Sequence, residues 1–150
     1  MDKNNFFKSI SLRIPGTLNY EFKKNQPLLM NIIQKIILRK EISIFNPQNK
    51  FNNILDTYEL FKILSFLIKK KIYKNDVYNL SSSYPLSFIS IIKIIEKKLD
   101  INAIIHQEFK IKKKSFLISH KKINNDYKIS ISSTKKIITR FCENLKKKDD

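Results

Sequence analysis

The first structural element that the sequence predicts lies in Ser9-Ile10-Ser11-Leu12-Arg13-Ile14-Pro15-Gly16. Ile10, Leu12 and Ile14 alternate with polar residues, which is the period of two that is typical of a β-strand. The Pro-Gly pair then ends this strand. Gly16 is the single glycine of the chain. Because loops that cradle phosphates need two or three glycines at fixed spacing, this chain cannot build such a loop alone.

Strands and helices alternate along the rest of the chain. We expect further strands at residues 42–45, 76–80 and 101–109, and helices at residues 28–40, 56–71, 88–99 and from Ser133-Thr134 onward. Pro27 suits a first helical position, Asp56 to Glu59 fits a capping box, and Ser87 suits an N-cap. No internal repeat or long linker divides the 150 residues. The pattern predicts an α/β fold in one domain.

The apolar residues of the helices recur at a spacing that places them on one side. The predicted buried positions are Leu60, Ile63, Leu64, Leu67 and Ile68 in the second helix, Ile91, Ile92 and Ile95 in the third, and Ile137, Ile138, Phe141 and Leu145 in the last. Phe61, Phe66 and Phe88 also have core spacing, and Cys142 is interpreted as a core thiol. The lysine-rich run 110–114 is expected to be a solvated turn, and the tail 146–150 to fray.

The charge balance leaves two interpretations open. The sequence has 30 Lys and Arg against 13 Asp and Glu, a formal net charge of +17. Such an excess favours nucleic acid or another anionic partner. However, lysine, isoleucine and asparagine make up nearly half of the chain, which is typical of a very AT-rich coding sequence. Arginine, the better residue for bidentate phosphate contacts, occurs only at Arg13, Arg39 and Arg140.

Metal sites and membrane spans are not expected. One cysteine excludes an intramolecular disulfide and a cysteine-based zinc site, and His106 and His120 are too isolated for a metal cluster. No apolar run reaches the length of a transmembrane helix, and the first residues do not form a signal peptide. We therefore expect a cytoplasmic protein.

The ordered segments resemble the C-terminal half of an extended short-chain dehydrogenase/reductase, the NAD-dependent epimerase/dehydratase family that acts on nucleotide sugars. Leu12-Arg13-Ile14-Pro15-Gly16 resembles the family's Leu-Arg-x-Pro strand end with its following glycine. Residues 52–60 occupy the place of a stretch usually written Arg-x-Phe-x-His-Val-x-Asp-Leu, and Val77-Tyr78-Asn79-Leu80 resembles a strand that the family ends in Gly-Ser. Lys122-Ile123 and Ser132-Ser133-Thr134 resemble the closing segment before the last helix.

The resemblance implies a single partial domain over residues 1–150, with the last strands of a Rossmann-like sheet and the substrate-binding part of the enzyme. It places the family's glycine-rich cofactor loop and its catalytic Tyr-x-x-x-Lys pair upstream of Met1. Tyr73-Lys74 and Tyr127-Lys128 have the wrong spacing to replace that pair. We therefore expect no catalytic residue in this chain, and NAD or NADP as a cofactor that the chain does not bind alone.

The resemblance also assigns positions to the ligands. Backbone at Ile14, Pro15 and Gly16 would border the cofactor, although the same residues suit a simple strand stop. Thr17 and Asn19 would face the sugar, where loop polarity explains them equally. Asn52 and Asn53 would approach the substrate nucleotide; Asn52 stands where the family often has a diphosphate-binding arginine, and an Asx turn is the alternative. Glu59 replaces the family's aspartate and is interpreted as structural, and Ser81 stands in place of a glycine.

Three hypotheses follow from these observations. The chain is a truncated or split nucleotide-sugar epimerase, dehydratase or reductase. It is either a fragment of a longer reading frame or a separate chain whose partner is a cofactor-binding chain, and a homo-oligomer is the other partner considered. Alternatively, the chain is a small basic nucleic-acid-binding domain, or a non-enzymatic interaction remnant whose first strand leaves an unpaired edge. The buried spacing of the phenylalanines argues against a stacking platform for nucleic acid.

Overall fold

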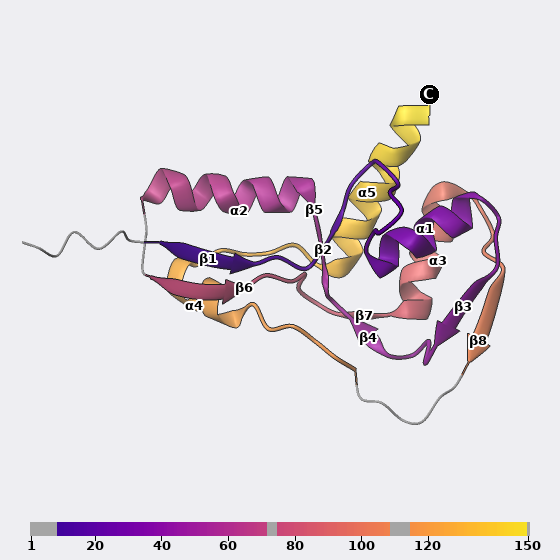
Figure 1. Cartoon of the computed structure of the whole chain (residues 1–150), viewed down its shortest axis with the longest axis horizontal. Coiled ribbons are helices and arrows are strands. Elements are labelled where there is room, and N and C mark those ends of the chain that lie inside the picture. The colour runs from indigo at the N-terminus through magenta and orange to yellow at the C-terminus, as the bar shows by residue number, and fades with distance from the viewer. Residues whose placement is uncertain (1–8, 72–74, 109–114, 150) are drawn as a thin grey trace, which may run out of the picture.

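A computed structural model describes residues 9–71, 75–108 and 115–149 of the chain (Figure 1). Strands and helices alternate in it, so the predicted α/β class is confirmed. The strands join in separate two-stranded pairs rather than in one continuous sheet. The lysine-rich run at 110–114 lies outside the described residues.

Two parallel pairs follow one another through the opening stretch of the sequence. Strand β1 (Ile10–Arg13) pairs with β6 (Asp76–Asn79), and the register places Arg13 opposite Asn79. Both strands confirm the sequence prediction. After Pro15 the chain continues at once into β2 (Gly16–Leu18), which pairs with β5 (Ile54–Asp56). The Pro-Gly pair therefore ends one strand and begins another, which the sequence analysis did not expect.

The remaining strands are short. Strand β3 (Ile42–Phe45) confirms its prediction and pairs in parallel with β8 (Ile105–Glu108). The predicted strand at 101–109 is wrong for residues 101–104, because the amides of Ile101 and Ala103 donate to the backbone and side chain of Glu96 at the end of the preceding helix. Strands β4 (Lys50–Phe51) and β7 (Leu86–Ser87) form an antiparallel pair that was not predicted.

The long helices begin near their predicted caps. They are α1 (Leu28–Ile37), α2 (Thr57–Lys70), α3 (Phe88–Leu99) and α5 (Thr134–Asp149). Asp56 and Ser87 each accept a hydrogen bond from the backbone amide three residues on, so both predicted N-caps are confirmed. Pro27 is the cap of α1 rather than its first residue, and α1 ends before the predicted 40 because Arg39 is left-handed, with φ of 51°.

Two helical segments differ from expectation. Helix α4 (Lys121–Tyr127) was missed, because only Ile123 and Tyr127 of its seven residues are buried. Helix α5 continues to Asp149 and so includes residues 146–149 of the tail that is expected to fray. No helix in the described part of the chain is long and apolar enough to cross a membrane.

One cluster of buried residues forms the core, and it extends from α1, α3 and α5 through β5 to α2, β6 and α4 (Figure 1). The predicted inward residues of α3 and α5 are buried, as is Cys142. Burial raises the pKa of the Cys142 thiol to about 12, which keeps it protonated. Phe141 is buried and stacks on Tyr20, with ring centroids 5.3 Å apart.

Helix α2 buries a narrower side than its sequence predicts. Ile63 and Leu67 are buried as expected. However, Phe61 is 71% exposed, Ile68 is 65% exposed and Leu64 is 38% exposed, so the core prediction for these three residues is wrong. In Figure 1, α2 lies along the β1–β6 pair at one end of an elongated molecule, and no described element covers its outer side.

Candidate functional site

A pocket of about 510 Å³ opens between the two parallel pairs of strands that the opening sequence forms. It lies at the carboxyl ends of β1 and β6, where ligands bind in open α/β sheets. Its wall consists of Arg13, Ile14, Pro15, Gly16, Asn53, Asn79, Phe116, Leu117, Ile118 and Ser119. Apolar surface, backbone and a few polar side chains alternate in this lining, as is usual for a small-molecule site.

The structure brings part of the predicted site together. Ile14, Pro15 and Gly16 all line the pocket, and so does Asn53. Thr17 and Asn19 do not, because each side chain bonds locally. Thr17 Oγ1 donates to the Pro15 carbonyl at 3.3 Å, and Asn19 Oδ1 accepts from the Glu21 amide at 3.0 Å. The ligand roles of all these residues stay predictions.

Gly16 is needed for close packing rather than for an unusual backbone angle. Its φ is not positive. A Cβ atom at this position would lie 3.1 Å from Cβ of Pro27 and 3.4 Å from the Asn53 carbonyl oxygen. A side chain here would therefore push the start of α1 away from the loop before β5 and change the shape of the pocket.

Asn52 is a buried structural residue in this arrangement, with 4% of its surface exposed. Its amide nitrogen donates to the Ile118 carbonyl at 2.8 Å and its amide oxygen accepts from the Ile118 amide at 3.0 Å. A third contact joins the amide nitrogen to Ser81 Oγ at 3.3 Å. Asn52 thus fastens the segment after residue 115 to the body of the protein, and it does not line the large pocket.

The sequence analysis missed the polar contacts of Ser81 and His120. Ser81 Oγ donates to the Ile118 carbonyl at 2.8 Å and lies 3.0 Å from His120 Nδ1. Burial lowers the pKa of His120, which keeps the imidazole neutral near pH 7. His120 lines a second cavity of about 220 Å³ with Asn52, Pro85, Leu117, Ile118, Ser119 and Lys121. The one sequence signal for these contacts was that Ser81 stands where the resembled family has a glycine.

Asn53 carries an unsatisfied polar atom at the edge of the large pocket. Its Oδ1 is buried and has no hydrogen-bond partner among the residues that the structure describes. Leaving a buried acceptor without a partner costs about 1–3 kcal/mol, and natural proteins contain few such atoms. An atom of this kind beside a pocket indicates a place where a ligand donor can compensate the cost.

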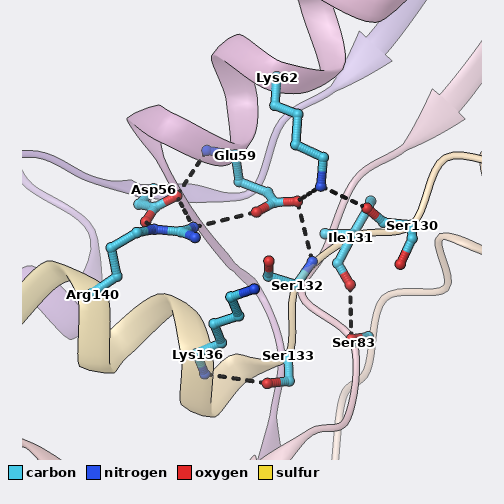
Figure 2. Close-up of polar contacts among 10 residues, drawn as sticks. All are labelled: Asp56, Glu59, Lys62, Ser83, Ser130, Ile131, Ser132, Ser133, Lys136 and Arg140. Atoms are coloured by element: carbon cyan, nitrogen blue, oxygen red, sulfur yellow. Dashed lines mark hydrogen bonds and ion pairs between the residues drawn. The ribbon is translucent and has the colours of Figure 1, made fainter.

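The charged cluster shown in Figure 2 joins α2 to α5 and leaves no open site. The Arg140 guanidinium donates to both Asp56 oxygens, at 2.7 and 2.8 Å, and to Glu59 Oε2 at 3.3 Å. Glu59 Oε1 accepts from Lys62 Nζ and from the Ser132 amide. Glu59 is fully buried, which agrees with its structural interpretation, and Asp56 rather than Glu59 caps the helix.

Two tyrosines do have a lysine four residues further on, and the sequence analysis overlooked both pairs. Tyr20 precedes Lys24 and Tyr58 precedes Lys62. The first pair lies outside any helix, and the Tyr20 ring stacks on the core. The second pair lies in the first turns of α2, where Lys62 Nζ donates to Glu59 and to the Ser130 carbonyl. None of these four residues lines the large pocket.

Comparison with known proteins identifies the fold of the chain but does not assign the chain to a family. No protein-family model matches the sequence, and no curated protein matches it. Solved structures do match. The chain superposes on UDP-glucose 4-epimerase from Thermotoga maritima, solved with UDP-glucose, with a TM-score of 0.70 and 12% sequence identity over 95% of this chain and 47% of that chain.

Two enzymes from Bacillus anthracis are similar in the same way. The dTDP-glucose 4,6-dehydratase, solved with NAD, gives a TM-score of 0.65 at 12% identity over 93% of this chain and 45% of that chain. The dTDP-4-dehydrorhamnose reductase, solved with NADP, gives 0.64 at 14% identity over 88% and 47%. The chain thus has part of the Rossmann-like fold of these enzymes and spans about half of their length.

Proposed function

We propose that the chain is the substrate-side part of an NAD(P)-dependent enzyme that acts on a nucleotide sugar. The observation that carries this proposal is the pocket at the carboxyl ends of β1 and β6. The three residues expected beside the cofactor and Asn53, expected beside the substrate, line this same cavity. Solved enzymes of similar fold were crystallised with NAD, NADP, UDP-glucose or UDP-glucuronic acid, which supports this ligand class.

The proposal includes a separate part that supplies the dinucleotide-binding loop and the acid/base pair. A chain with one glycine cannot form the glycine-rich turn against which a pyrophosphate packs. The tyrosine–lysine pairs that the chain does contain lie away from the pocket. The separate part belongs to a longer reading frame or is another chain, since a second copy of this one would carry the same single glycine. Without this part the reaction has no positioned proton donor.

Titration calorimetry of the isolated chain tests the substrate class. UDP-glucose should bind, and Asn53→Ala should weaken binding about three- to tenfold because one hydrogen bond is lost. Asn102→Ala is the matched control, since Asn102 is exposed between α3 and β8 and lines neither cavity. Equal affinity of the Asn53→Ala variant and the wild type would remove Asn53 from the site.

Binding of the cofactor and binding of nucleic acid are the two measurements that can contradict this proposal. The isolated chain should not bind NAD+ and should not reduce it in the presence of UDP-glucose; binding or turnover by the chain alone would contradict the need for a separate part. A band-shift titration at two salt concentrations separates the second hypothesis. Tight DNA or RNA binding that persists at physiological salt, without binding of UDP-glucose, would replace the proposed function with nucleic-acid recognition.

A further inference from the structure

Arg13 is the one arginine that lines the large pocket, and the resemblance assigns it no ligand. It is the last residue of β1, it is exposed, and it faces Asn79 at the end of β6. No ion pair or side-chain hydrogen bond occupies its guanidinium among the described residues. The charge is therefore available to a ligand in the pocket.

The other two arginines do not compete for this role. Arg140 is engaged by Asp56 and Glu59 and does not line the pocket. Arg39 follows the end of α1 and lines neither cavity. Asn52, which replaces the arginine expected to bind the diphosphate, has its amide fully used by Ile118 and Ser81. If the pocket binds a phosphoryl group through arginine, Arg13 is the residue that can do so.

The remaining polar lining suits the uncharged part of such a ligand. Asn53 lines the pocket, and its buried Oδ1 lacks a partner among the described residues. A ligand hydroxyl would satisfy it. Backbone at Gly16 carries no side chain that would keep a ligand away from the wall. The pocket therefore combines a planar cation for phosphoryl oxygens with an acceptor for a hydroxyl.

We propose that the Arg13 guanidinium binds a phosphoryl group in this pocket while Asn53 accepts a hydrogen bond from a hydroxyl of the same ligand. The inference rests on the proposed function, under which the phosphoryl group belongs to the diphosphate of a nucleotide sugar. The guanidinium replaces, from strand β1, the arginine that the sequence lacks at position 52.

The test is calorimetric titration of wild type, Arg13→Gln, Arg13→Lys and Arg39→Gln with UDP-glucose and with inorganic pyrophosphate. Arg13→Gln should weaken binding of both ligands at least about tenfold, because a charge-assisted hydrogen bond is lost. The affinity of Arg13→Lys should lie between those of wild type and Arg13→Gln, since lysine keeps the charge and loses the bidentate geometry. Arg39→Gln removes the same charge outside the pocket and should match the wild type. Thermal melts verify that each variant is folded.

The outcomes separate the two proposals. Binding of UDP-glucose with equal affinity by wild type and Arg13→Gln would overturn the role of Arg13 and leave the proposed function standing. Arg13-dependent binding of pyrophosphate without binding of UDP-glucose would support the phosphoryl site and overturn the nucleotide-sugar class. A wild type that binds neither ligand overturns both. An equal loss in Arg39→Gln would show general attraction by net charge and would also overturn the role of Arg13.

Discussion

At the scale of single residues, the buried charges of Asp56, Glu59 and Arg140 do more for the fold than the many surface lysines. Exposed ion pairs contribute little, whereas removing one partner of a buried pair leaves an uncompensated charge. Arg140 provides a bidentate contact that lysine cannot reproduce. This cluster fixes the start of α2 against α5 (Figure 2), and thereby holds β5 beside the pocket.

Glu59 gives this cluster a measurable dependence on pH. Burial by itself would raise the pKa of Glu59, but hydrogen bonds from Lys62 and Ser132 and the charge of Lys62 outweigh it, and the pKa is lowered. The folded state is therefore stabilised above the unfolded pKa, about 4.3 for glutamate. This contribution is lost as the pH falls through the lower pKa of the folded state.

We expect the free energy of unfolding, measured with urea, to fall between pH 5 and acid pH by less in Glu59→Gln than in wild type. Glutamine cannot titrate, so the part of the fall that comes from Glu59 disappears. Glu143→Gln is the control, because Glu143 is a half-exposed carboxyl on α5. An identical fall in wild type and Glu59→Gln would show that the carboxylate does not stabilise the fold.

At the scale of elements, the shortage of glycine leaves strained residues at helix ends. Lys71, Asp100 and Lys128 are the C-terminal caps of α2, α3 and α4, and all have φ between 50° and 59°. This left-handed conformation favours glycine and costs other residues about 1 kcal/mol. These three helices therefore end at residues whose left-handed backbone conformation is unfavourable for a residue with a side chain.

Replacing Asp100 with glycine should stabilise the protein by about 0.5–1 kcal/mol. Glycine relieves the left-handed strain, and the change also removes a negative charge from the carboxyl end of a helix. Lys93→Gly supplies the opposite case: Lys93 is exposed inside α3, where glycine should destabilise by about 1 kcal/mol. Urea unfolding of both variants measures the difference. Destabilisation by Asp100→Gly would mean that its side chain has a role that backbone strain does not explain.

Elements with a strong hydrophobic period could be predicted from the sequence, and short elements could not. Strand β3 and helix α3 have the predicted bounds, since alternation and a serine cap mark them locally. The strands β2, β4, β5 and β7 have two or three residues each, too few to show a period. Their pairing depends on partners far along the chain, which no local pattern reveals.

The candidate site divides in the same way. Ile14 to Gly16 and Asn53 were predicted through ordered motifs and line the pocket. Residues 116–119 were not, because the bonds from Asn52 that place them span 66 residues of sequence. Arg13 was predicted to lie on the polar side of a strand and in the Leu-Arg-x-Pro segment, without a ligand role. Its position becomes informative once β6 and the segment after residue 115 are in place around it.

At the scale of the whole molecule, an open apolar side distinguishes this chain from a self-contained domain. Phe61, Leu64 and Ile68 are exposed on α2. Parallel sheets are normally covered on both faces by other elements, so a parallel pair with an open side is unusual. This side is where the proposed separate part would have apolar surface to cover.

We expect the purified chain to associate as its concentration rises, because exposed apolar patches of this kind drive self-contact. Sedimentation velocity measures the distribution of species. The double variant Phe61→Lys and Ile68→Lys should shift it toward monomer without lowering the melting temperature. Tyr84→Lys is the control, since Tyr84 is 80% exposed and lies on the loop before Pro85 rather than on α2. A wild type that stays monomeric at high concentration would contradict the open-side interpretation.

Leu117, Ile118 and Ser119 belong to the walls of both cavities, and this limits how the two can be studied. A substitution in this common wall changes two volumes at once, so its effect on a ligand cannot be attributed to either. Residues outside the wall separate them: Asn79 reports on the larger cavity alone, and Pro85 on the smaller. A compound that displaced this wall from one cavity would change the affinity of the other cavity for its own ligand. The coupling free energy would then be the same whichever of the two ligands bound first.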